Sequence, residues 1–79
     1  MYAVVERGTP VPPSRQIAGF LRARIVSGEL GPGSPLPSIV SLSQEYGVAT
    51  NTVRKALRVL RDEGLIESVP GYGTFVAAR

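Results

Sequence analysis

Residues 47–64 read GVATNTVRKALRVLRDEG, and they contain the clearest helical pattern in this 79-residue sequence. The apolar residues of this stretch recur with the spacing i, i+3, i+4 and i+7, which aligns them on one face of an α-helix. They are Val53, Ala56, Leu57 and Leu60. Thr50 and Asn51 stand at the start as caps or exposed polar groups, and Gly64 is suited to end the helix. The stretch therefore predicts an amphipathic helix between its two glycines.

The opposite face of this predicted helix is basic. Arg54, Arg58 and Arg61 follow the spacing i, i+4 and i+7, with Lys55 beside them. Like charges at this spacing destabilise a helix by about 0.2–0.5 kcal/mol per pair, so the stripe suits a surface that binds a polyanion. The alternative is an ordinary solvent-exposed face, as most charge runs are, and the stripe alone does not decide between the two.

Composition excludes several classes of function. The chain has no cysteine and no histidine, so it has no disulfide, no thiolate nucleophile and no imidazole base or metal ligand. No two of the six acidic residues form a convincing catalytic pair. We therefore expect no enzyme activity, no metal and no cofactor.

The net charge of +3 is unevenly distributed. Four of the nine basic residues lie between residues 50 and 63. Such a concentration of positive charge on one element is typical of a nucleic-acid-binding surface. No apolar run approaches the roughly 18 residues of a membrane span, and the N-terminus lacks the layout of a signal peptide. We expect an intracellular protein with no membrane partner.

The first half of the chain predicts an arm, a helix and a turn-rich segment. Residues 1–13 contain three prolines and no helical period, which indicates an extended N-terminal arm. Ser14 is the expected N-cap of a helix that ends near Gly28. Residues 31–37, GPGSPLP, cannot continue a helix, and Leu36 is expected to lie on a short strand there.

A second pair of elements surrounds the basic helix. Ser38 can cap a short helix, IVSLSQEY, which Gly47 ends, and two helices joined by a tight glycine turn have the helix-turn-helix layout. A plain αα-hairpin in a small bundle has the same layout. Residues 65–69 and 74–77 then read as two strands around a Pro-Gly-Tyr-Gly turn. A β-hairpin directly after a recognition helix is typical of the wing of a winged helix-turn-helix. Tyr72 at this turn could contact another surface or simply lie on Pro70.

These pieces, in this order and spacing, resemble the N-terminal DNA-binding domain of GntR-type bacterial transcription regulators. The resemblance covers about residues 14–77 through IVSGELGPGSPLPS, LSQEYGVATNTVRKALRVLRDEGLIES and GYGTFV. It implies an α+β, mainly α, winged helix-turn-helix with the order α-β-α-α-β-β. It also implies binding of double-stranded operator DNA, usually as a dimer on an inverted repeat, in the bacterial cytoplasm.

The resemblance assigns roles to individual residues. Ser38 matches a serine that holds a phosphate at a helix N-terminus, and Thr52 matches a phosphate-binding threonine. Arg54 matches an arginine that reads bases, with guanine as its preferred target. The expected DNA-binding residues are Ser38, Thr50, Asn51, Thr52, Arg54, Lys55, Arg58, Gly71, Tyr72 and Gly73. Arg61 is expected to face a phosphate or to be merely solvated.

The sequence also departs from the family pattern. Val40 and Thr50 stand where the family usually has arginines, and Ala49 replaces a Ser or Thr N-cap. Asn51, which could pair with adenine, partly replaces the missing arginines. We therefore expect an operator of different sequence, bound more weakly per half-site.

The sequence predicts a transcriptional repressor with residues 14–79 as its DNA-binding domain. No effector domain and no effector site are expected within these 79 residues. Two other functions fit the same fold: an architectural or recombination accessory DNA binder, and a protein-interaction winged helix. Binding of single-stranded RNA is not favoured, because the sequence lacks the aromatic side chains on which unpaired bases would stack.

Overall fold

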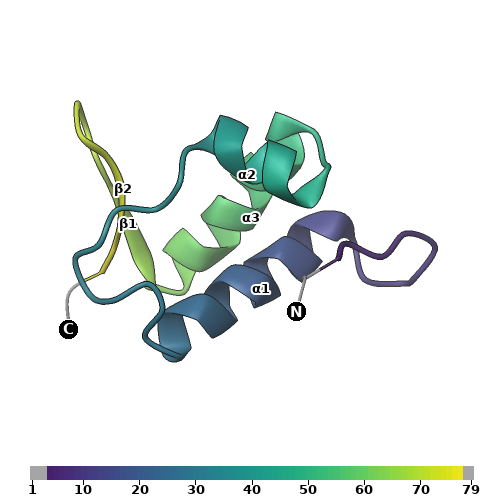
Figure 1. Cartoon of the computed structure of the whole chain (residues 1–79), viewed down its shortest axis with the longest axis horizontal. Helices are drawn as coiled ribbons and strands as arrows, with labels where there is room; N and C mark the ends of the chain where they lie inside the picture. The colour runs from purple at the N-terminus through teal and green to yellow at the C-terminus, as the bar shows by residue number, and fades with distance from the viewer. Residues whose placement is uncertain (1–3, 78–79) are drawn as a thin grey trace.

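The computed structural model describes residues 4–77 and contains three helices followed by an antiparallel hairpin. The helices are α1 (Pro13–Val26), α2 (Ile39–Tyr46) and α3 (Thr50–Asp62), and the strands are β1 (Ile66–Val69) and β2 (Gly73–Val76). In Figure 1, α3 lies between α1 and α2, and the hairpin stands beside the end of α3. This arrangement confirms the predicted winged helix-turn-helix.

The apolar face of α3 forms the centre of the core. All of its predicted apolar residues are buried, and Val53 and Leu60 are completely so. They pack against α1 through Ile17 and Leu21 and against α2 through Leu42. Each fully buried aliphatic side chain stabilises a fold by about 1.5–3 kcal/mol, so this face determines which way α3 is turned.

The predicted ends of α2 and α3 are confirmed. The Ser38 hydroxyl oxygen accepts a hydrogen bond from the Ser41 backbone N–H at 3.0 Å, and Gly47 ends α2 in the left-handed region at φ 66°. At the end of α3, Gly64 has φ 77°, and its N–H donates to the Arg61 carbonyl at 2.9 Å. Such a left-handed residue satisfies the last carbonyls of a helix, and glycine adopts it without strain.

The predicted N-cap of α1 is wrong. Ser14 does not cap α1, because the helix already begins at Pro13 and Pro12 occupies the cap position without a side-chain bond. Proline favours the first helical position because its φ angle is fixed near the helical value. At the start of α3, Ala49 is the N-cap, as its alignment with the family's Ser or Thr cap indicated, and no side chain there accepts a hydrogen bond. Of the two roles left open for Thr50, the structure therefore excludes the cap.

The strand expected around Leu36 is only a single bridge between Pro35 and Phe75. The Leu36 N–H donates to the Thr74 carbonyl at 2.9 Å, which joins this segment to the hairpin. Its neighbours Pro35 and Pro37 have no N–H to donate, so the ladder cannot continue through them. The order of regular elements is therefore α-α-α-β-β with one bridge before α2.

The hairpin is close to its predicted position. Both strands begin one residue away from the expected limits, and the register pairs Ile66 with Val76 and Ser68 with Thr74. Residues 70–72 form the turn, where the Tyr72 N–H donates to the Val69 carbonyl at 2.9 Å. Gly71 has φ 82°, which explains the glycine at the tip.

Residues 4–12 contain no helix or strand and are fastened to the helices. The Gln16 side chain accepts from the Glu6 N–H and donates to the Glu6 carbonyl, both at 2.7 Å. The Arg7 guanidinium donates to the Gly47 carbonyl at 3.1 Å, next to the turn before α3. Residues 1–3 of the predicted arm and residues 78–79 of the predicted domain lie outside the described range.

Replacing Leu60 with Ala tests the role of the α3 core. Leu60 is completely buried, so the variant loses apolar burial and leaves a cavity. We expect the free energy of unfolding to fall by about 2–5 kcal/mol, measured by urea denaturation. Val26→Ala, at an exposed site, is the control and should change stability by less than about 0.5 kcal/mol. Equal effects of the two substitutions would contradict this description of the core.

A pH-dependent contribution to stability comes from Glu63. Its carboxylate accepts two hydrogen bonds from Arg22 of α1, at 2.6 and 2.8 Å, and the bond to Arg22 holds its pKa below the ordinary value. A carboxyl group whose pKa is lower in the folded protein than in the unfolded chain stabilises the fold at pH values above its pKa in the unfolded chain. This stabilisation is lost as the pH falls through the pKa of the group in the folded protein. The difference in Tm between wild type and Glu63→Gln should therefore shrink from about pH 6 to about pH 3. A difference that stays constant over this range would show that the pair does not contribute.

Candidate nucleic-acid interface

The exposed face of α3 carries the basic residues. Because the apolar face is held in the core, Arg54, Arg58 and Arg61 all lie on the solvent side. Their spacing of four and three residues keeps them on one stripe of the helix. The Arg54 Nη1 donates to the Asn51 side-chain oxygen at 3.2 Å, so these two side chains are held together at the first turns of the helix.

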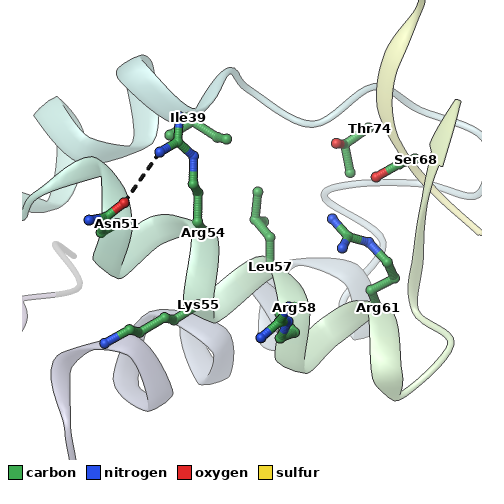
Figure 2. A pocket seen from close by; sticks show the side chains of 9 residues that line it. All are labelled: Ile39, Asn51, Arg54, Lys55, Leu57, Arg58, Arg61, Ser68 and Thr74. Atoms are coloured by element: carbon green, nitrogen blue, oxygen red, sulfur yellow. Dashed lines mark hydrogen bonds between the residues drawn. The ribbon is translucent and has the colours of Figure 1, made fainter. Parts of the chain in front are cut away.

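A groove of about 460 Å³ runs between α3 and the hairpin. It is lined by Ile39, Asn51, Arg54, Lys55, Leu57, Arg58, Arg61, Ser68 and Thr74. In Figure 2, Leu57 lies between Arg54 and Arg61, and Ser68 and Thr74 face Arg61 from the hairpin. Four of the lining residues are cationic and none is acidic, so the groove suits an anionic ligand.

Three of the six acidic residues pair with cations of α1. Glu63 bonds Arg22, and Glu29 and Glu45 both lie within ion-pair distance of Arg24, at 2.6 and 3.4 Å. No arginine of α3 has an ion-pair partner within residues 4–77. The described part of the chain is therefore divided into a largely neutralised face on α1 and an unneutralised basic face on α3.

The described residues contain no group of three His, Cys, Asp or Glu side chains that could hold a metal ion. None of the helices between residues 4 and 77 is long and apolar enough to cross a membrane.

Residues 6–76 match the family described as bacterial regulatory proteins, gntR family. The chain belongs to the GntR family. It is 48% identical over 62 residues to the mannosyl-D-glycerate transport/metabolism system repressor MngR of Escherichia coli (strain K12). It is 40% identical over 73 residues to the HTH-type transcriptional repressor NagR of Bacillus subtilis (strain 168). These alignments cover 78% and 92% of this chain but only 26% and 30% of the two repressors, so the chain spans less than a third of their length.

The fold is shared with solved GntR-type structures. AraR(DBD) in complex with operator ORX1 superposes with a TM-score of 0.89 at 34% identity, covering 96% of each chain. YtrA of Sulfolobus acidocaldarius, a GntR-family transcription factor, has a TM-score of 0.88 at 35% identity, covering 100% of this chain and 83% of that one. The winged helix-turn-helix expected from the sequence is thus the fold of the family.

The groove brings together four of the residues predicted from the sequence: Asn51, Arg54, Lys55 and Arg58. Ser38 immediately precedes Ile39 of the groove wall, but its oxygen already accepts from Ser41. Thr50 is half-buried at the start of α3 and does not line the groove.

The other predicted residues lie away from the groove. Thr52 precedes Arg54 by two residues and is therefore about 160° from it around the helix, on the opposite flank. Gly71, Tyr72 and Gly73 form the exposed tip of the GntR wing, and Tyr72 is 80% exposed. Tyr72 thus has the freedom to contact a partner.

Ser68 and Thr74 of the groove were not predicted from the sequence. The signal for them is the alternation of the hairpin strands, because residues two apart share a face. Ile66 and Val76 face the core, so Ser68 and Thr74 lie on the same face one step further out.

Proposed function

We propose that this chain binds a specific duplex DNA sequence and represses transcription by occupying an operator. The observation that carries this proposal is the unneutralised basic face of α3, which borders a groove without acidic residues in a GntR fold. Support comes from the likeness to AraR(DBD) in complex with an operator and from the names of the similar repressors.

The dimensions of α3 fit this proposal. A helix with its side chains is about 10–12 Å wide, and the major groove of B-DNA is about 12 Å wide. Recognition helices contact bases mainly with their N-terminal residues. We therefore assign base contacts to Thr50, Asn51, Arg54 and Lys55. Asn51 suits adenine and Arg54 suits guanine, because each side chain can pair with two atoms of that base.

Contacts to the DNA backbone come from both flanks of the helix. A helix that fills the major groove has one sugar–phosphate strand on each side, so Thr52 and Arg58, on different flanks, suit different strands. Ser38 is assigned to a phosphate near the start of α2. The wing tip, with Gly71, Tyr72 and Gly73, is assigned to the backbone or the adjacent minor groove. These contacts would fix the register without reading sequence.

The proposed DNA-binding unit is residues 14–79, preceded by the arm of residues 1–13. We further propose that two copies bind an inverted repeat. The chain would act in the bacterial cytoplasm, and it would act by binding DNA without catalysing a reaction. The similar repressors are more than three times as long as the aligned region. Their likeness to this chain therefore concerns the DNA-binding region, and repression by this chain is part of the proposal.

Selection of bound duplexes from a random pool, at near-physiological salt, tests sequence-specific binding. We expect enrichment of one motif, because the base-facing residues differ in the bases they suit. An inverted repeat would support two copies on DNA, and a single half-site would overturn that part of the proposal. Recovery of unbiased sequences would contradict specific binding by this chain.

Substitution of Arg54 by Ala tests its assignment to a base pair. We expect the affinity for the selected duplex to fall by about 1–3 kcal/mol and the preference at one base pair to relax. The measurement is anisotropy titration against duplexes that vary one position at a time. Arg15→Ala, which removes the same charge from an exposed position on α1, should leave every preference unchanged. If Arg54→Ala keeps the full preference at all positions, Arg54 does not read a base.

A further inference from the structure

The inner face of the wing changes from apolar to polar along its length. Ile66 and Val76 form a buried cross-strand pair that closes the core. The next pair on the same face is Ser68 and Thr74, whose Cβ atoms lie about 4.5–5.5 Å apart in such a ladder. Both positions are accessible, with Ser68 exposed and Thr74 half-buried. The two hydroxyls line the groove.

Arg61 faces these hydroxyls from the last turn of α3. Figure 2 shows its side chain directed toward Ser68 and Thr74, away from Lys55. Arg61 is exposed and has no ion-pair partner within residues 4–77. It also shares the groove with Arg58, a like charge one turn away, which is unfavourable unless an anion lies between the helix and the wing.

The chemistry of this end of the groove is that of a phosphate site. A guanidinium offers several N–H donors in a planar fork that matches phosphate oxygens, and each hydroxyl adds one O–H donor. The buried Leu57 between Arg54 and Arg61 gives the groove an apolar floor.

The geometry of duplex DNA identifies the phosphate. A major groove and the minor groove beside it are separated by one sugar–phosphate strand. A helix in the major groove and a wing that contacts DNA beyond it must therefore straddle that strand. The space between α3 and the hairpin, which is this groove, is where the straddled strand would pass.

We propose that Arg61, with the hydroxyls of Ser68 and Thr74, binds a phosphate of the DNA strand that passes between α3 and the wing. This inference rests on the proposed function and adds a sequence-independent contact to it. In this proposal Arg61 contributes to the affinity for DNA and to its salt dependence, whereas Arg54 contributes to the preference for a base.

The test compares Arg61→Ala with Arg15→Ala on the selected duplex and on an unrelated duplex. Loss of one phosphate contact lowers the slope of log K against log salt by about 0.9. We expect Arg61→Ala to bind both duplexes about tenfold more weakly at ~0.15 M salt, with this reduced slope. Arg15→Ala should keep the wild-type slope, and Arg61→Lys should recover most of it because the charge is retained.

Neutral methylphosphonate linkages, placed one at a time along each strand, locate the contact. We expect one or two adjacent positions to weaken binding of wild type but not of Arg61→Ala, because the variant has already lost that contact. The double variant Ser68→Ala, Thr74→Val should bind several-fold more weakly with an unchanged salt slope, since hydroxyls carry no charge. All these side chains are exposed or half-buried, so folding is checked simply by the Tm of each variant.

The outcomes separate this inference from the proposed function. If wild type binds a selected duplex while Arg61→Ala keeps its slope and its methylphosphonate pattern, the phosphate site is wrong and the proposed function stands. If the double variant binds like wild type, the hydroxyls have no part in it. If wild type binds no duplex, the proposed function itself fails.

Discussion

The burial of one face of α3 controls both the stability of this domain and the direction of its charges. Val53, Ala56, Leu57 and Leu60 are held between α1 and α2, so the helix cannot rotate about its axis without exposing them. Rotation by one residue in one direction would bring Arg58 and Arg61 to the buried positions of Leu57 and Leu60. Rotation in the other direction would bring Lys55 to the buried position of Ala56. Burying such a charge without a partner costs several kcal/mol. The same packing that stabilises the fold therefore directs Arg54, Arg58 and Arg61 outward.

The wing has no large contact area of its own and depends on attachments at its base. The Pro35–Phe75 bridge and the bond from the Leu36 N–H to the Thr74 carbonyl join it to the segment before α2. The Ala77 N–H donates to the Leu65 carbonyl at 2.9 Å, which extends the pairing beyond the strands. A two-stranded hairpin is only marginally stable alone, so these bonds and the burial of Ile66 hold it beside α3.

The sequence predicts the elements with strong local signals. The period of α3, the Ser38 cap and the glycines at 47 and 64 are all local, and the structure confirms them. The predicted start of α1 was two residues too late, because Ser14 is a good N-cap type but Pro13 already takes the first helical position and Pro12 the cap position. The strand at Leu36 was overestimated, although the flanking prolines already showed that its ladder could not extend.

The site could be predicted only where it lies on one helix. Asn51, Arg54, Lys55 and Arg58 share the groove because helical spacing alone places them together. Ser68 and Thr74 reach the groove through the placement of the hairpin, which depends on contacts with residues more than 30 positions earlier in the chain. The pairing of Arg22 with Glu63, 41 residues apart, was likewise invisible to local patterns. Roles in DNA contact stay predictions, for Ser38, Thr52 and the wing tip as much as for the helix.

The hydrogen bond between Asn51 and Arg54 has a consequence for any change of specificity. The Asn51 Oδ1 accepts this bond from the Arg54 Nη1 at 3.2 Å, which favours one arrangement of these two exposed side chains before any partner arrives. Less side-chain entropy is then lost on binding, where each immobilised side chain costs about 0.5–1.5 kcal/mol. In the DNA complex proposed above, the two residues would therefore act together. A new binding preference would have to be selected at both positions together, since replacing Asn51 alone would also release Arg54.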